Sequence, residues 1–262
     1  RLGVAGVAIA TVVSQYLALA LVLICLMRLE GCAQLELKKL RFYPDEALRM
    51  IQIGLPAGLQ SVIFNISNVM IQSSINSFGA DVVAANTAAG NLDSFIYTAC
   101  NSVYHASMTF TSQNLGAGKY DRVDKILRYA IAIGVGFGAV MALLMQFIAP
   151  SVVRPFTSDE AVVKAGAAYI RSYIFDCLFA GIQFSFSGYF CAWGRSGLSF
   201  LHNTLSILMV RVPGAWLACR FFPQTLVPMG LAPACGSLFS SIVCVLLYRW
   251  MKRQNKPTGD KD

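Results

Sequence analysis

The chain has 262 residues, of which 56% are hydrophobic and only 13% are charged. A water-soluble protein carries about 25% charged residues, so this composition excludes an ordinary soluble enzyme and indicates a protein surrounded by membrane lipid. The net charge of +8 would suit nucleic-acid binding, but the basic residues flank apolar runs without an interleaved aromatic platform, so we expect no nucleic-acid partner.

Seven apolar runs are long enough to cross a bilayer as helices, which takes roughly 20 residues each. The runs are continuous, whereas the strands of a membrane barrel alternate between apolar and polar residues. The sequence therefore predicts an all-α polytopic membrane protein with seven transmembrane helices. In chain order, the predicted spans are residues 2–27, 48–78, 82–113, 126–150, 163–192, 198–222 and 227–251.

Most of the Lys and Arg residues lie in alternate connectors, at 28–49 and 119–128, and at the C-terminal end, 249–261. The positive-inside rule assigns these basic connectors to the cytoplasm. We therefore expect a cytoplasmic C-terminus and, with an odd number of spans, an outside position for residue 1. Because the chain starts directly on an apolar run without Met, we also expect it to be the back portion of a longer protein.

Polar residues recur at helical spacing in the second, third and fifth spans, which places them on one face of each helix. Polar residues inside a membrane usually face a bundle interior or a water-filled path, so we expect these faces to converge on a cleft. The alternative is that they bridge helices by structural hydrogen bonds. The candidate cleft-lining residues are Gln60, Asn65, Asn68, Gln72, Asn86, Tyr97, Asn101 and Gln183.

Two acidic residues, Asp93 and Asp176, belong to the polar faces of the third and fifth spans. An ionised carboxylate at membrane depth costs roughly 2.5–3.5 kcal/mol even on a lenient insertion scale. The cost falls when the group takes up a proton, binds a cation or pairs with a base. Both residues are therefore candidate coupling-ion or proton sites; the alternative is structural pairing, with Arg211 as one partner.

The sixth span carries Arg211 two residues before Pro213. Because proline lacks a backbone N–H and bends a helix, we interpret Arg211 as a structural counter-charge at a kink, with substrate contact as the alternative. Pro56 predicts a second bend in the second span. The glycine-rich run at 134–138 favours close helix contact in the fourth span.

Motifs for catalysis or metal binding are missing. The eight cysteines form no C-x-x-C pair, and we interpret His105 and His202 as structural because neither has metal-site spacing. The Gly-Ala-Gly-Lys run at 116–119 is followed by Tyr120 rather than Ser or Thr, so it is not a phosphate-binding loop. We expect no enzyme activity, no cofactor and no metal other than Na⁺, and active transport that draws on an ion gradient or a separate subunit.

Several segments resemble the multidrug and toxic compound extrusion (MATE) transporters. Residues 111–122, Thr-Ser-Gln-Asn-Leu-Gly-Ala-Gly-Lys-Tyr-Asp-Arg, resemble the signature after the eighth helix of that family. Residues 53–60 are similar to the opening of its seventh helix, residues 84–93 to its "AAYTAANRIE" segment, and residues 193–196 to the turn after its tenth helix. The resemblance runs along nearly the whole chain.

The resemblance implies a transporter of twelve helices in two six-helix lobes. Residues 1–27 would be the last helix of the N-terminal lobe and residues 28–47 a cytoplasmic linker. Residues 48–252 would form the C-terminal lobe, and residues 253–262 a cytoplasmic tail. It also implies a secondary antiporter of the plasma membrane that exports cationic or amphiphilic compounds in exchange for H⁺ or Na⁺ by alternating access, together with an N-terminal lobe outside this chain.

The resemblance carries one functional residue over directly, since Asp93 takes the position of the acidic residue that ends the family's 84–93 segment. Members of the sodium-coupled branch also have a glutamate in the seventh helix, whereas residues 50–78 contain no acidic group. Their tenth-helix aspartate corresponds to a position near Ala180, one turn from Asp176. Two alternatives stay open: a flippase of the same superfamily for a lipid-linked saccharide, and a non-transporting membrane scaffold.

Overall fold

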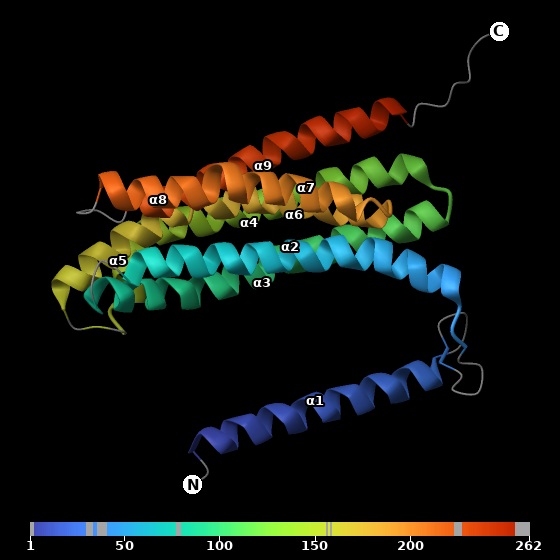
Figure 1. Cartoon of the computed structure of the whole chain (residues 1–262), viewed down its shortest axis with the longest axis horizontal. Helices are drawn as coiled ribbons and strands as arrows, with labels where there is room; N and C mark the ends of the chain where they lie inside the picture. The colour runs from blue at the N-terminus through green and yellow to red at the C-terminus, as the bar shows by residue number, and fades with distance from the viewer. Residues whose placement is uncertain are drawn as a thin grey trace. The chain divides into compact units, whose positions relative to one another are not determined.

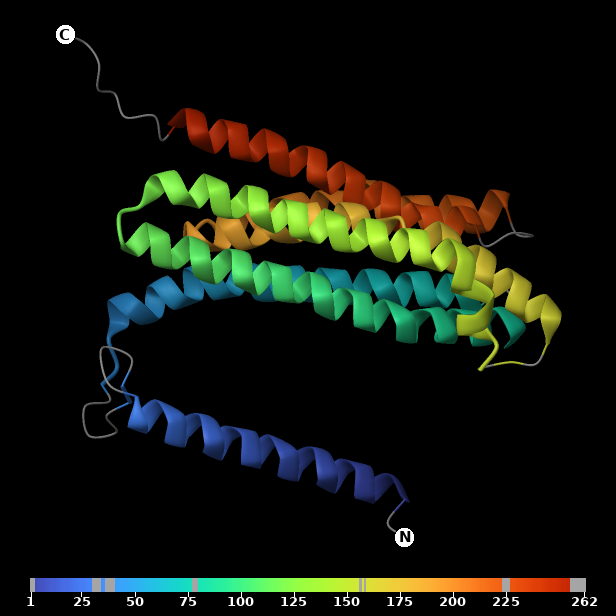
Figure 2. The ribbon, with the colours of Figure 1, turned by 180° about the vertical axis from the view of Figure 1, so that it is seen from behind.

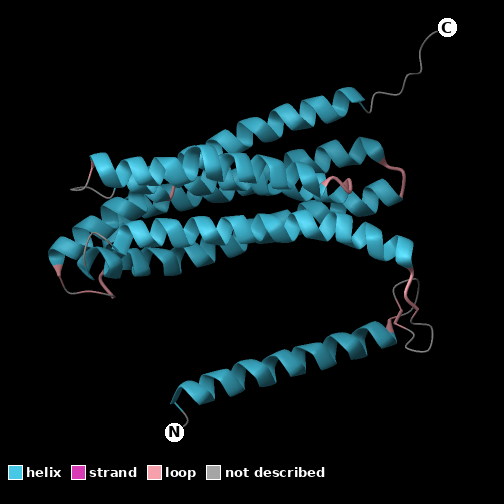
Figure 3. Ribbon diagram, in the orientation of Figure 1, coloured by secondary structure: helices cyan, strands magenta, loops and turns pink. Residues whose placement is uncertain are grey.

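The computed structural model describes residues 3–29, 34–35, 41–76, 80–155, 157, 159–222 and 227–254, which are almost entirely helical and contain no strand (Figure 3). The chain divides into two compact units, Arg1–Arg49 and Met50–Asp262. The helices are α1 (Gly3–Arg28), α2 (Pro44–Asn76), α3 (Ala80–Gly116), α4 (Tyr120–Val153), α5 (Glu160–Tyr173), α6 (Asp176–Ala192), α7 (Ser196–Ser206), the π-helix η2 (Ile207–Arg211), α8 (Val212–Phe221) and α9 (Val227–Gln254).

The described helices form seven rods, because α5 and α6 follow one another across a short turn and α7, η2 and α8 are continuous. The predicted all-α fold with seven helices is therefore confirmed. Within the described residues, five segments are long and apolar enough to cross a membrane. These segments are Ala8–Arg28, Pro44–Ser73, Tyr120–Val153, Glu160–Ala192 and Val227–Gln254.

In the second unit, the rods lie side by side and roughly parallel (Figures 1 and 2). Helix α6 is central, since it packs against α3, α4 and α9. One buried apolar cluster surrounds Ile170, Ile174 and Met229, and a second surrounds Phe186 and Phe190. A central position for α6 means that its polar residues are removed from lipid by neighbouring helices.

Glycines allow α4 and α6 to approach at backbone distance. A Cβ atom added at Gly181 would lie 2.6 Å from the carbonyl carbon of Gly134, and one added at Gly138 would lie 2.8 Å from the carbonyl oxygen of Cys177. A Cβ atom at Gly136, between these contacts, would meet nothing within 4 Å. The glycine-rich run thus makes a close helix contact through one of its faces, as small residues often do in membrane bundles.

We expect Gly181→Ala to destabilise the protein by about 1–3 kcal/mol, because the added methyl group overlaps backbone that no side-chain rotation can move. Thermal unfolding in detergent would measure this loss. Gly136→Ala is the matched control and should leave the unfolding temperature unchanged or slightly raised, since alanine is the better helix former. Equal unfolding temperatures for the two variants would contradict the packing argument.

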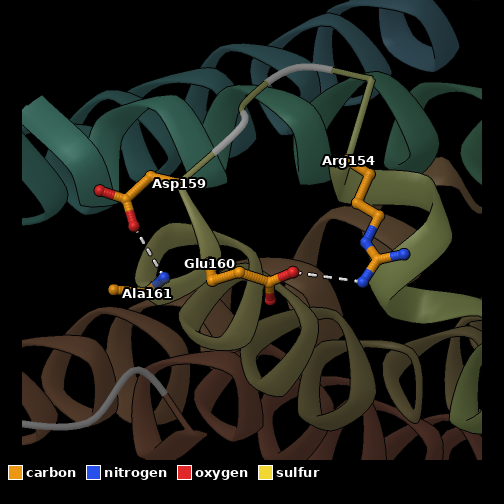
Figure 4. A network of polar contacts seen from close by, with 4 residues as sticks. All are labelled: Arg154, Asp159, Glu160 and Ala161. Carbon is orange, nitrogen blue, oxygen red and sulfur yellow. Dashed lines mark hydrogen bonds and ion pairs between the residues drawn. The ribbon is translucent and has the colours of Figure 1, made fainter.

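The connection between α4 and α5 is held by two polar contacts (Figure 4). The Asp159 carboxylate accepts a 2.8 Å hydrogen bond from the backbone N–H of Ala161 and so caps the start of α5. Arg154 forms an ion pair with Glu160 at 3.2 Å. Both contacts are exposed, and the Asp159 cap marks the start of the α5–α6 rod that carries the central polar residues.

Two of the rods are interrupted, one at a position without a helix-breaking residue and one at the kink predicted beside Pro213. The predicted span 163–192 breaks at Ile174 and Phe175, so that Asp176 becomes the first residue of α6, where the helix dipole favours a carboxylate. The sixth span contains the π-helical turn that ends at Arg211, two residues before Pro213. A proline supplies no N–H to the preceding turn, which explains a wider turn there. Helix α2, by contrast, runs through Pro56 as one helix.

Candidate functional site

A cavity of about 360 Å³ lies between α2, α3, α6 and α7 in the second unit. Its walls combine carboxamide and hydroxyl groups with aromatic rings, and the lining residues that the structure describes are all uncharged at neutral pH. Apolar walls with a few polar groups are typical of small-molecule sites. The lining residues are Ala57, Gln60, Ser61, Phe64, Asn65, Tyr97, Asn101, Tyr104, Gln183, Phe184, Ser187 and Asn203.

Three aromatic rings connect the walls of the cavity. The ring of Tyr97 on α3 lies 5.5 Å from that of Phe64 on α2 and 5.5 Å from that of Phe184 on α6. The second pair has an edge-to-face geometry, which is favourable for aromatic pairs. These contacts offer flat, polarisable surfaces to an organic compound.

Helix α2 is joined to the other rods by polar contacts at and below the cavity. Ser199 on α7 donates a 3.0 Å hydrogen bond to the side-chain oxygen of Gln60. Two turns further along α2, Asn68 accepts a 3.1 Å hydrogen bond from the guanidinium of Arg211. Helix α2 also makes apolar and aromatic contacts, since Ile71 packs against the buried apolar cluster around Ile170 and the Phe64 ring lies beside that of Tyr97.

A buried polar cluster of Asp176, Gln183, Arg211 and Ser237 lies behind the cavity. Asp176 is only 2% exposed, and its Oδ1 atom makes no hydrogen bond within the described part of the chain. Arg211 and Ser237 are the charged and hydroxyl groups that act on this carboxylate. Gln183, two turns along α6, donates a 3.2 Å hydrogen bond to Ser237 and also lines the cavity. The cluster therefore connects a buried acid to the cavity wall.

Arg211 occupies the other side of this cluster. Its guanidinium lies 4.6 Å from the centroid of the Phe64 ring, in a cation–π geometry, and its Nε atom has no hydrogen-bond partner among the described residues. Asp176 attracts it electrostatically without a direct ion pair between them. Phe64 thus separates a buried positive charge from the cavity.

The structure brings five of the predicted cleft residues together, since Gln60, Asn65, Tyr97, Asn101 and Gln183 all line the cavity. Asn68 lies outside the lining and binds Arg211, and Gln72 is half-buried further along α2. The side chains of Asn86 and Asp93 lie outside the described residues, although both positions belong to α3. Within the described residues, no group of three or more His, Cys, Asp and Glu lies together as a metal site.

Lining residues that were not among the predicted cleft residues include Phe64, Phe184 and Asn203. Phe64 follows Gln60 by four residues and so lies on the polar face of α2, but an aromatic residue in an apolar run looks like core. Asn203 could have been found from helical spacing, because Ser199, Asn203 and Ser206 follow one another at steps of four and three in the sixth span. Phe184 directly follows Gln183 in the sequence, and helical spacing does not place neighbouring residues on the same face.

The family is decided by a comparison of the sequence with family models. The MatE family model matches residues 56–217, a range that includes every residue of the cavity lining. The chain belongs to the MatE family. Together with the long apolar helices, this membership makes it a multi-pass membrane protein.

Relatives and solved structures agree with this membership. "Probable multidrug resistance protein YpnP" of Bacillus subtilis is 27% identical over 250 residues, which cover 95% of this chain and 55% of the relative. The "FAD transporter" of Shewanella oneidensis is 26% identical and covers 83% of this chain and 48% of the relative. The chain spans about half the length of the curated relatives it matches.

The fold is also that of solved MATE transporters. A mutant of the Vibrio cholerae MATE transporter VcmN superimposes with a TM-score of 0.87 at 20% sequence identity, over 97% of this chain and 57% of that chain. The resemblance stated from sequence motifs is therefore confirmed.

Proposed function

We propose that the protein carrying this MatE chain is a secondary active antiporter that exports small organic compounds, cationic or amphiphilic, in exchange for H⁺ or Na⁺. The observation that carries the proposal is the uncharged cavity of about 360 Å³, lined by aromatic rings and carboxamides. Its volume is within the range of small-molecule sites, about 300–1,000 Å³. Ring faces attract organic cations, and carboxamides accept and donate hydrogen bonds in several orientations.

Ion coupling is assigned in this proposal to Asp176 and Asp93. Asp176 is supported by its burial and by an oxygen without a hydrogen bond, because such a carboxylate gains free energy when it binds a proton or a cation. Its link to the cavity through Ser237 and Gln183 offers a route by which ion binding alters substrate affinity. Asp93 is supported by the family resemblance of residues 84–93.

The proposed topology follows the basic residues and the family resemblance. Residues 1–27 are the last helix of an N-terminal lobe, residues 28–47 a cytoplasmic linker, residues 48–252 the C-terminal lobe and residues 253–262 a tail in the cytoplasm. The start of α4 and the end of α9 are both basic, and Lys252 on α9 forms an ion pair with Asp124 on α4. These two basic ends therefore lie on the same side, which the positive-inside rule assigns to the cytoplasm. The membrane in this proposal is the plasma membrane, and alternating access opens the cavity first to one side of it and then to the other.

Proteoliposomes of the full-length protein would test this function. A cationic dye, rhodamine 6G, and FAD are loaded separately, and export is followed under an imposed H⁺ or Na⁺ gradient. The proposal expects export of rhodamine 6G that accelerates with one of the two gradients. Export of FAD alone would overturn the cationic specificity, and the absence of gradient-driven export of either compound would overturn the antiporter.

In the same assay, we expect Asp93→Asn to reduce gradient-driven export of rhodamine 6G while expression stays unchanged, because asparagine neither binds a proton nor carries a negative charge. Asp121→Asn is the control, since Asp121 is an exposed acid in the first turn of α4. Unchanged export and unchanged ion dependence in Asp93→Asn would remove Asp93 from the mechanism.

A further inference from the structure

His202 forms a fully buried hydrogen-bonded chain with two serines from other helices. The ring is 0% exposed on α7. Its Nε2 atom lies 3.0 Å from the hydroxyl of Ser187 on α6, and its Nδ1 atom lies 2.7 Å from the hydroxyl of Ser240 on α9. Both ring nitrogens are thus engaged, and the three rods α6, α7 and α9 meet at this imidazole.

Ser187 links this chain to the cavity. It is one of the lining residues, while His202 and Ser240 lie behind it and do not line the cavity. A serine hydroxyl can donate one hydrogen bond and accept two. His202 uses only one of these, so Ser187 keeps hydrogen-bonding capacity for a molecule inside the cavity.

The tautomer of His202 determines whether the Ser187 hydroxyl donates or accepts a hydrogen bond in the cavity. A neutral imidazole has one N–H and one bare nitrogen. When Nδ1–H donates to Ser240, Nε2 accepts the Ser187 proton, and Ser187 offers lone pairs to the cavity. When Nε2–H donates to Ser187, the Ser187 O–H is free to donate into the cavity. In both tautomers the imidazole orients the Ser187 hydroxyl.

We propose that His202 is a positioning residue for substrate, which orients the Ser187 hydroxyl as a hydrogen-bonding group of the cavity. The inference rests on the proposed transport function and adds a substrate class. Phe184 lies one helical turn from Ser187 on the same helix and also lines the cavity. The site therefore selects aromatic compounds that carry a hydrogen-bonding group about one helical turn from the ring.

Two probes separate this role from a purely structural one. Rhodamine 6G has an aromatic system with N–H and carbonyl groups, whereas tetraphenylphosphonium has aromatic rings and a positive charge without any hydrogen-bonding group. Affinities for both are measured at equilibrium with the full-length protein, without an ion gradient. Binding of the probes by the wild-type protein tests whether the cavity takes organic cations, as the proposed function requires. The role of His202 is tested by whether a variant weakens binding of rhodamine 6G more than binding of tetraphenylphosphonium.

We expect Ser187→Ala and His202→Leu each to weaken rhodamine 6G binding by about 3- to 10-fold, the range for one lost hydrogen bond. Tetraphenylphosphonium binding should change by less than about twofold, because it makes no hydrogen bond. The double variant should bind rhodamine 6G no more weakly than either single variant, since both changes remove the same interaction. His202→Gln, which retains a donor and an acceptor, should recover most of the affinity.

Ser185→Ala is the matched control. Ser185 is also buried on α6, but its hydroxyl donates to the backbone carbonyl of Gly181 and it does not line the cavity. Should His202→Leu fail to fold, Ser187→Ala and His202→Gln still test the proposal. Equal losses for both probes, additive losses in the double variant, or unchanged rhodamine 6G binding in Ser187→Ala would each overturn it.

Discussion

An Asp176→Asn variant of the full-length transporter is expected to lose the acceleration of export by the ion gradient while it still binds substrate. Asparagine preserves the shape of the side chain and its polarity toward Ser237, but it cannot exchange a proton or hold a cation. We expect the ion-dependent change in substrate affinity to fall by about 5- to 150-fold, which corresponds to a coupling free energy of about 1–3 kcal/mol. Substrate affinity measured with and without the ion gives this change. Gradient-driven export in proteoliposomes, compared with gradient-free exchange, gives the lost acceleration.

Two variants calibrate the Asp176 experiment. Asp176→Glu keeps the charge and should retain part of the ion dependence. Asp159→Asn changes an exposed acid that caps the start of α5 by accepting a hydrogen bond from the backbone N–H of Ala161. This variant should leave the ion dependence unchanged. If Asp176→Asn exports as fast as the wild type under the same gradient, the buried carboxylate has no part in coupling.

The second large effect is on stability. We expect Arg211→Met to lower the free energy of unfolding by about 1.5–3 kcal/mol, the range for a lost hydrogen bond to a charged group, because Asn68 loses its donor and Asp176 loses the positive charge that acts on it. Asp176 is 2% exposed, and Arg211 is the charged group that acts on it. The lost hydrogen bond to Asn68 joins α2 to the bundle. Denaturant unfolding in detergent, followed by tryptophan fluorescence, would measure the change.

A second substitution identifies the cause. Arg211→Met combined with Asp176→Asn should be more stable than Arg211→Met alone, because no unbalanced charge remains. Arg220→Met is the control: Arg220 is exposed at the end of α8, where its guanidinium lies 5.3 Å from the Trp216 ring, so its loss should cost little. Additive destabilisation in the double variant would show that Arg211 does not act as the counter-charge of Asp176.

The positions of the helices could be predicted closely from the sequence, because the thickness of a bilayer sets the length of each apolar run. The predicted span 227–251 corresponds to Val227–Gln254, and the span 82–113 to Ala80–Gly116. The interruption before Asp176 could not be predicted, since neither proline nor glycine occurs at Ile174 or Phe175. Hydrophobicity changes little across such a break, so the sequence pattern predicts one helix where the structure has two, α5 and α6.

The candidate site divides in the same way. Helical spacing was sufficient to select Asn65, Asn101 and Gln183, because intramembrane amides are costly and so mark a protected face. The spacing could not distinguish Asn68, which binds Arg211, from the amides that line the cavity. Partners of this kind come from other helices, and their distance along the chain is unrelated to their distance in space.

By itself, the sequence determined that this chain is a helical membrane protein of the MATE type, with basic residues between its apolar runs and two acidic residues, Asp93 and Asp176, within the predicted spans. The tertiary structure decided which side chains share a cavity and which lie behind it. It also decided that His202, interpreted as structural from the sequence alone, joins Ser187 in the cavity wall to Ser240. The physical reason is that insertion into a bilayer depends on the composition of each segment alone, whereas a site depends on the rotation and depth at which separate helices pack.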